Sequence, residues 1–263
     1  MKKILLLFVL GLLFANPMVQ AMDSIRVGNV MRSMIVYAPK DLPKNRPLII
    51  SMHGMNQDAP YQQSKALWEP VADTAKFVVV YPNGIAKRWD ISGNTDLEFI
   101  QAIIDQMALK FGIDRKRVYL SGFSMGGMMT YYAATKMADK IAAFAPVSGF
   151  MMRGNTSVNS TRPVPIIHTH GDADDVVRYP GLPAYLDLWV KFNQCNPSPV
   201  VTKPYPSTKT NSIAEKTLWS AGVGKVEVML LKLAGKGHWY STDEANGVHT
   251  SSEIWNFCKK YSL

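Results

Sequence analysis

Short, uninterrupted apolar runs recur along this chain, and each one ends at a glycine or a polar turn. Runs of this length without polar alternation are typical of strands that are covered on both faces. Two shorter apolar segments near the start, residues 25–27 and 34–37, predict two opening strands. The main runs are residues 48–52, 77–81, 118–120, 144–147, 166–168 and 226–233.

Between these runs, apolar residues recur at the three- and four-residue spacing of amphipathic helices. Regular alternation of strand and helix predicts an α/β fold with a mostly parallel central sheet and helices on both faces. The segment 196–211, rich in Pro, Ser, Thr and Lys, predicts a long surface loop. The expected helices are 64–76, 95–111, 125–137, 182–192 and 250–261.

The first 21 residues have the pattern of a secretory signal peptide. Lys2 and Lys3 precede an apolar run over 4–15, and small residues follow up to Ala21. The run is too short to span a bilayer, so we expect cleavage after Ala21 rather than a membrane anchor. The mature chain, residues 22–263, is then a single domain that is secreted or periplasmic.

Composition narrows the class of protein further. Of 263 residues, 47% are hydrophobic and 19% charged, which is sufficient for a sizeable core and argues against disorder. The net charge is +9 and falls to +7 without the two signal-peptide lysines (9 − 2). Because Lys and Arg are spread along the chain, we do not expect nucleic-acid binding. A basic surface could at most attract acidic polysaccharide.

The chain has two cysteines, Cys195 and Cys258. Export places them in an oxidising compartment, which favours a disulfide between them. Two separate buried thiols are the alternative. Two cysteines are too few for a disulfide scaffold or a four-cysteine zinc site, and we expect no metal.

Ser124 is the candidate nucleophile. It lies in Gly122-Phe123-Ser124-Met125-Gly126, between an expected strand and an expected helix. G-x-S-x-G in that setting is the nucleophile elbow of α/β-hydrolases, where a sharp turn lifts the serine hydroxyl clear of the sheet. The helix N-terminus beside it favours developing negative charge.

A serine hydroxyl needs a base, and the chain has five histidines. His238 follows the last expected strand in a glycine-flanked loop, which favours it as the base. His53 sits in a strand-end loop that its side chain is expected to buttress. His168 and His170 alternate along one strand, but they lack an evident third metal ligand. His249 opens the last helix and is expected to be exposed.

The acid that orients the base should follow the preceding strand, where three aspartates occur. Asp174 stands before Val176 and Val177, whose apolar side chains can fix the loop, so Asp174 is favoured. Asp172 and Asp175 remain open alternatives, either as the acid or as turn and surface carboxylates.

The tetrahedral intermediate of ester hydrolysis needs two backbone donors. The amide of Met125, directly after the nucleophile, should be one. The amide of Met55, in the loop after the strand 48–52, should be the other. Candidate substrate contacts come from loops at strand ends: Trp89, Trp239 and Tyr240, with 150–152 as a further wall.

The combination of these motifs resembles the secreted esterases of carbohydrate esterase family one, a group of acetylxylan and feruloyl esterases. It is also similar to polyhydroxybutyrate depolymerase-like esterases. Many of the latter carry cysteine where this chain has Met55 and Arg88, which tilts the resemblance toward the carbohydrate esterases. The matching segments are 48–54, 56–57, Trp68, 78–82, 111–114, 117–119, 122–130, 145–149, 170–171, Asp174 and 235–238.

The resemblance implies an α/β-hydrolase fold and the roles assigned above to Ser124, Asp174 and His238. We therefore expect a secreted serine carboxylesterase that removes acetyl or feruloyl groups from plant cell-wall xylan. It would act without a cofactor, and a monomer is the favoured state. The alternatives are a polyhydroxybutyrate depolymerase-like or short-chain esterase, and a carbohydrate-binding module on an inactive hydrolase fold.

Overall fold

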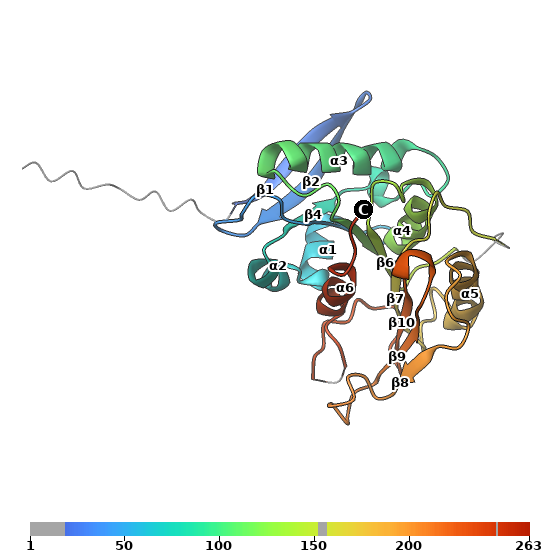
Figure 1. Ribbon diagram of the computed structural model, residues 1–263. Coiled ribbons are helices and arrows are strands. Elements are labelled where there is room, and N and C mark those ends of the chain that lie inside the picture. Colours follow the sequence, from blue (N-terminus) through green and yellow to red (C-terminus); the bar gives the residue numbers. More distant parts are fainter. Residues whose placement is uncertain (1–18, 152–156, 246) are drawn as a thin grey trace, which may run out of the picture.

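Ten described strands form one sheet in a computed structural model that describes residues 19–151, 157–245 and 247–263. The order across the sheet is β1-β2-β4-β3-β5-β6-β7-β10-β9-β8 (Figure 1). The strands are β1 (Val19–Val27), β2 (Val30–Ala38), β3 (Leu48–Met52), β4 (Val78–Pro82), β5 (Val118–Phe123), β6 (Ala143–Val147), β7 (Ile166–Gly171), β8 (Val200–Thr202), β9 (Ala214–Trp219) and β10 (Val228–Leu233).

The middle of the sheet is parallel and both of its margins are antiparallel. From β4 through β3, β5, β6 and β7 to β10, every neighbour pair runs parallel. The outer strands β1, β2, β9 and β8 pair antiparallel. All residues of β3, β4, β5, β6 and β7 are buried, which explains their uninterrupted apolar runs. The predicted mostly parallel sheet is confirmed.

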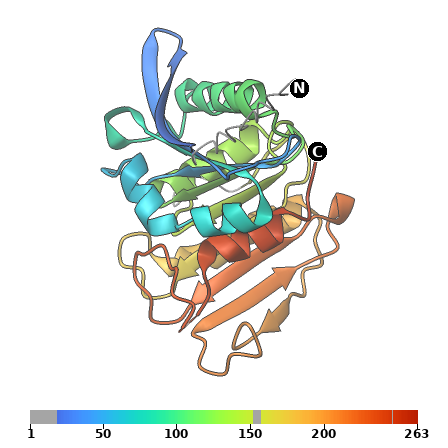
Figure 2. The same ribbon diagram turned by 90° about the vertical axis from the view of Figure 1, so that its left-hand side faces the viewer.

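Helices cover both faces of the sheet, as the alternating pattern predicted. Three of them pack on one face: α3 (Thr95–Phe111), α4 (Met125–Lys136) and α5 (Leu182–Phe192). The other face is covered by α1 (Ala59–Ala66), α2 (Glu69–Ala75) and α6 (Thr250–Cys258). Figure 1 shows α1, α2 and α6 to the left of the sheet and α4 and α5 to its right. Figure 2 views the molecule from the side of α1, α2 and α6.

The carboxyl ends of the central strands meet at one edge of the sheet. Met52 of β3 pairs with Gly122 of β5, and Phe123 pairs with Val147 of β6. Loops that leave these strands therefore converge, and in open α/β sheets ligands bind in the crevice outside these ends.

The helix predicted over 64–76 is two helices. Leu67 ends α1 in the left-handed conformation, with φ 49°. Pro70 lies in the first turn of α2 and has no N–H to donate to the carbonyl of Ala66, four residues earlier. A continuous helix would also bring the proline ring against that carbonyl, so the chain breaks between the two.

The predicted surface loop 196–211 contains a strand, β8, which pairs with β9 at the sheet margin. Val200 and Val201 of β8 are 62% and 54% exposed. Backbone pairing, rather than side-chain burial, therefore holds this strand. A hydrophobic pattern cannot reveal an element whose side chains face solvent.

The predicted disulfide between Cys195 and Cys258 is wrong in this structure, where both are free and buried thiols. Cys195 packs in the core between the sheet and α3, α4 and α5. Cys258 packs in the core on the opposite face. Because the sheet separates the two cores, the alternative of two separate buried thiols is the one observed. Burial raises the pKa of both thiols.

The predicted signal peptide, residues 1–21, lies outside the described residues apart from 19–21, which begin β1. Within the described ranges, none of the helices is both long and apolar enough to span a bilayer.

Candidate active site

Ser124 stands alone between the end of β5 and the start of α4. Its backbone has φ 54° and ψ −116°, a strained conformation for a residue with a side chain. Its amide donates to the carbonyl of Val147 at 2.8 Å, which ties the turn to the neighbouring strand. A β-carbon on Gly122 would overlap the backbone of Gly126, so the turn requires glycine there. The predicted elbow is therefore present as a sharp, braced turn.

His238 lies in the loop between β10 and α6 and reaches across to Ser124. Its Nε2 is 2.9 Å from the Ser124 Oγ, and its Nδ1 is 2.7 Å from Oδ2 of Asp174. The Phe123 ring packs against the imidazole, with centroids 4.8 Å apart. The fold thus brings together three predicted residues that lie 114 and 64 positions apart in the chain.

Asp174 is the one of the three candidate aspartates that contacts His238. It is 4% exposed, and its Oδ1 accepts from the amides of Val176 at 2.9 Å and Val177 at 2.8 Å. Asp172 and Asp175 are exposed, and Asp172 accepts from the amide of Gly235. The geometry therefore favours Asp174 as the partner of the imidazole, with two backbone donors holding its carboxylate in place.

The two amides expected to bind an oxyanion have no hydrogen-bond acceptor among the described residues. Met125 is the first residue of α4, where helix amides lack intrahelical partners. Met55 follows Gly54, whose own amide donates to Oε1 of Gln57 at 2.9 Å. Neither methionine amide makes such a contact, so both are available to an anion.

His53 buttresses the loop after β3, as predicted. Its Nε2 accepts from the amide of Gly84 at 3.0 Å, so its Nδ1 carries the proton and donates to the Gly54 carbonyl at 2.7 Å. Burial lowers the pKa of His53, which keeps the ring neutral.

Trp89 packs against the same loop from the protein interior. This corrects the prediction that Trp89 contacts the substrate. Its side chain is buried, with 3% exposure, and its indole N–H donates to the His53 carbonyl at 2.7 Å. The two rings lie 4.8 Å apart. A buried indole with its donor already used is a structural residue.

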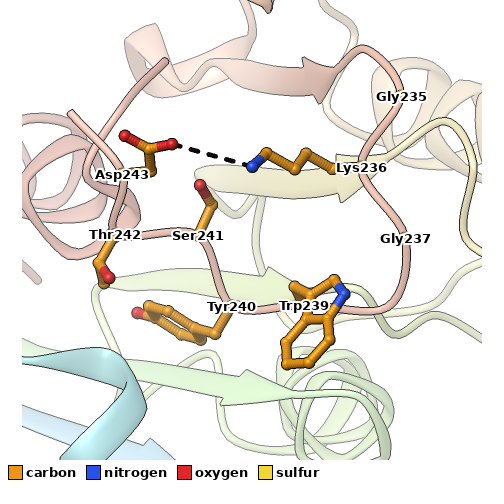
Figure 3. Close-up of a pocket in the computed structure, with 8 residues that line it drawn as sticks. All are labelled: Gly235, Lys236, Gly237, Trp239, Tyr240, Ser241, Thr242 and Asp243. Atoms are coloured by element: carbon orange, nitrogen blue, oxygen red, sulfur yellow. Dashed lines mark ion pairs between the residues drawn. The ribbon is translucent and has the colours of Figure 1, made fainter. Parts of the chain in front are cut away.

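Trp239 is 63% exposed and lines a pocket of about 450 Å³ that is formed by the loop carrying His238. Figure 3 shows Lys236 and Asp243 facing each other across this pocket, with their charged atoms 3.9 Å apart. An exposed aromatic face next to charged and hydroxyl groups suits a sugar ring or an aromatic acyl group. The pocket is also lined by Gly235, Gly237, Tyr240, Ser241 and Thr242.

Tyr240 borders the pocket but is itself buried, which corrects the prediction of a substrate contact. Its side chain is 8% exposed, and its hydroxyl pairs with that of Ser251 at 2.9 Å. Its ring packs edge-on against Phe123. Phe150, in the predicted wall 150–152, is likewise buried, and Met152 lies outside the described residues.

One set of residues near Asp174 was not assigned to the site from the sequence. His168 and His170 are completely buried on β7 and hydrogen-bond each other at 2.9 Å, and Tyr131 of α4 contacts His168. Histidines two positions apart on a strand share a face, and that spacing was the sequence signal that could have grouped His168 with His170. Tyr131 could not be found in that way, because only packing brings α4 onto this face.

A family model described as phospholipase/carboxylesterase matches residues 90–194. The chain is 43% identical to a bifunctional acetylxylan esterase/xylanase of Neocallimastix patriciarum over 234 residues, covering 88% of this chain and 34% of that protein. It is 27% identical to feruloyl esterase B of Piromyces equi, covering 88% of this chain and 46% of that protein. This chain thus spans about a third to a half of these relatives.

Among solved structures, an acetyl xylan esterase from Aspergillus awamori superimposes with a TM-score of 0.70 at 17% identity. The match covers 91% of this chain and 99% of that one. At such low identity the likeness shows the fold alone, and it confirms the predicted α/β-hydrolase architecture. The curated relatives above confirm the predicted resemblance to acetylxylan and feruloyl esterases. Their names agree with the predicted class of carboxylic ester hydrolase.

Proposed function

Since this chain has the α/β-hydrolase fold and is similar to acetylxylan and feruloyl esterases, we propose that it is a secreted serine carboxylesterase acting on acyl esters of xylan. One observation carries the proposal. A single unbroken line of hydrogen bonds joins the Ser124 hydroxyl, the His238 imidazole and the Asp174 carboxylate. Ser124 is the nucleophile, His238 the base and Asp174 the acid that orients it.

In the first half of the reaction, Oγ of Ser124 attacks the ester carbonyl carbon while Nε2 of His238 takes its proton. The carbonyl oxygen becomes an oxyanion, which the amides of Met55 and Met125 stabilise. Asp174 accepts from Nδ1 of His238, which holds the reactive tautomer and stabilises the imidazolium. His238 then protonates the leaving sugar oxygen, and the acyl group remains on Ser124.

In the second half, water replaces the sugar. His238 takes a proton from the water as it attacks the acyl carbon, and the same two amides hold the new oxyanion. Collapse breaks the bond to Ser124, whose oxygen recovers the proton from His238. The free acid leaves, and these steps need no metal ion or organic cofactor.

Two features support xylan as the carrier of the ester. The names of the relatives specify acetylxylan and feruloyl esters. Trp239 also presents an exposed aromatic face in a polar pocket directly after His238. The signal-peptide pattern of residues 1–21 supports export to where such polymers occur.

The test is a product assay with acetylated xylan, methyl ferulate and hydroxybutyrate oligomers side by side. We expect release of acetate or ferulate by the wild type and loss of turnover by at least about 10³-fold in Ser124→Ala. The exposed Ser92→Ala is the matched control and should keep full activity. Undiminished turnover by Ser124→Ala would overturn the proposal. Release of hydroxybutyrate alone would indicate hydroxybutyrate esters, rather than xylan esters, as the substrate class. Xylan binding without hydrolysis would indicate a carbohydrate-binding module.

A further inference from the structure

A buried line of hydrogen bonds runs from Tyr131 through His168 and His170 to the loop that carries Asp174. The Tyr131 hydroxyl lies 2.8 Å from Nδ1 of His168, and Nε2 of His168 lies 2.9 Å from Nδ1 of His170. Nε2 of His170 is 2.7 Å from the Val177 carbonyl and 3.3 Å from Oδ2 of Asp174. That oxygen of Asp174 is also the one that contacts His238.

The partners of each ring nitrogen determine where the protons are. The Val177 carbonyl can only accept, so Nε2 of His170 carries a proton and its Nδ1 accepts. Nε2 of His168 must then donate to it, which leaves Nδ1 of His168 to accept from the Tyr131 hydroxyl. The donors in this line therefore all run in one direction, from the Tyr131 hydroxyl to the Val177 carbonyl.

The two imidazoles are neutral because they are enclosed. Burial lowers the pKa of both His168 and His170, although the hydrogen bond to the Val177 carbonyl and the charge of Asp174 act in the opposite direction on His170. The charged or titratable groups that face His170 are His168 on its own strand, Asp174, His238 and Tyr179. A neutral His170 can lie 3.3 Å from Oδ2 of Asp174 without placing a second positive charge beside His238.

Helix α4 connects the two ends of this set of contacts, Ser124 and Tyr131. Ser124 precedes that helix directly, and Tyr131 lies seven residues later on it. From Tyr131 the contacts run through His168 and His170 to Asp174, then through His238 back to Ser124. The nucleophile and the acid, which come from different elements, are thereby held at a defined separation.

Resting on the proposed function, we propose that His170 is a positioning residue for the reaction. Its neutral N–H donates to the carbonyl of Val177, whose own amide donates to Oδ1 of Asp174, and Tyr131 and His168 hold the ring in the required tautomer. The ring thereby anchors the loop 174–177 and places the positive end of its N–H dipole 3.3 Å from Oδ2 of Asp174. It keeps Asp174 aimed at His238 and moderates how strongly the carboxylate stabilises the imidazolium.

The experiment compares His170→Leu, which removes the donor, with His170→Gln, which can retain an N–H near the position of Nε2. The matched control is Asn193→Leu, which also loses two buried hydrogen bonds beside β7, to the backbone of Val164, but lies outside the line. For each variant, kcat, KM and the pH profile of kcat/KM are measured on a soluble ester. The folded fraction is measured in parallel.

We expect His170→Leu to lower kcat about tenfold with KM changed less than about twofold, because the loop that holds Asp174 loses its hydrogen bond at Val177. Without the N–H dipole beside it, the carboxylate stabilises the imidazolium more, so the acidic limb of kcat/KM should move to higher pH. His170→Gln should regain most of both effects. Asn193→Leu should lose stability and leave the pH profile unchanged.

A His170→Leu enzyme with wild-type kcat and pH profile would overturn the proposal. So would a loss that follows the folded fraction as it does in Asn193→Leu. If His170→Leu does not fold, Tyr131→Phe decides: a wild-type pH profile in that variant overturns the proposal, and a shifted profile supports it. Retained activity in Ser124→Ala would instead refute the proposed function, whatever the His170 variants show.

Discussion

Gly149 lies directly against the backbone of Ser124, and a β-carbon on Gly149 would overlap the Ser124 carbonyl oxygen. The overlap is with backbone, so no side chain can move aside to relieve it. We expect Gly149→Ala to displace the elbow and lower kcat/KM at least about tenfold, with a loss of roughly 1–3 kcal/mol in the free energy of unfolding. Esterase kinetics and urea unfolding measure the two effects. Gly247→Ala is the control, because a β-carbon there meets its nearest atom at an ordinary 3.5 Å. Equal kinetics for both variants would contradict the expectation.

The three neighbouring aspartates should differ sharply in their effect on turnover. Asp174→Asn keeps the shape of the side chain but removes the charge that orients and stabilises the His238 imidazolium, so kcat should fall about 10³–10⁴-fold. Asp172→Asn and Asp175→Asn alter exposed carboxylates and should stay within about threefold of wild type. Kinetics of the three purified variants on one soluble ester provide the test. A larger loss in either neighbour than in Asp174→Asn would reassign the acid.

Trp239 should matter for the polymer and little for a small ester. Trp239→Ala removes an exposed aromatic face, which is worth about 0.5–1.5 kcal/mol of stacking, so KM for acetylated xylan should rise roughly two- to tenfold. KM for p-nitrophenyl acetate should change less than about twofold, because that ester is too small to span the pocket. Leu109→Ala, at an 88% exposed position on α3, is the control. Equal shifts on both substrates would argue against a subsite at Trp239.

Acid should destabilise the fold through its buried histidines. Burial lowers the pKa of His168 in the folded state, whereas in the unfolded chain it titrates near 6.5. Below about pH 6.5 the unfolded state therefore binds a proton that the folded state does not. Stability is lost as pH falls from that value toward the folded pKa, by up to about 1.4 kcal/mol per pH unit for this group. Urea unfolding between pH 5.0 and 7.5 should show a shallower dependence in His168→Gln. If the free energy of unfolding depends on pH equally in the wild type and in His168→Gln, His168 is not responsible for the loss of stability.

The two cysteines should behave as enclosed thiols. In the folded protein, burial and the raised pKa of Cys258 should make reaction with a thiol reagent slow. After unfolding without reductant, we expect two reactive thiols per chain and the same electrophoretic mobility with and without reductant. Titration with a chromogenic disulfide reagent gives the count. A count of zero before reduction would restore the predicted disulfide.

The sequence by itself determined the architecture and the turn that carries Ser124. Buried parallel strands read as continuous apolar runs, so β3, β4, β5, β6 and β7 could be placed from hydrophobicity alone. The elbow is local: its turn needs small residues within two positions of Ser124, and that requirement is visible in any sequence. The choice of His238 also followed from its place between the last strand and the last helix.

Only the tertiary structure decided among residues of the same type. Asp172, Asp174 and Asp175 differ in burial, and Asp174 contacts His238 whereas Asp172 contacts the amide of Gly235, both distant in the chain. Tyr240 and Trp239 are neighbours in sequence, yet one is buried and the other exposed. The expected oxidising compartment favoured a disulfide between the two cysteines, but the sheet separates them. Local patterns determine elements because backbone periodicity is local, whereas burial and partner choice depend on packing between elements.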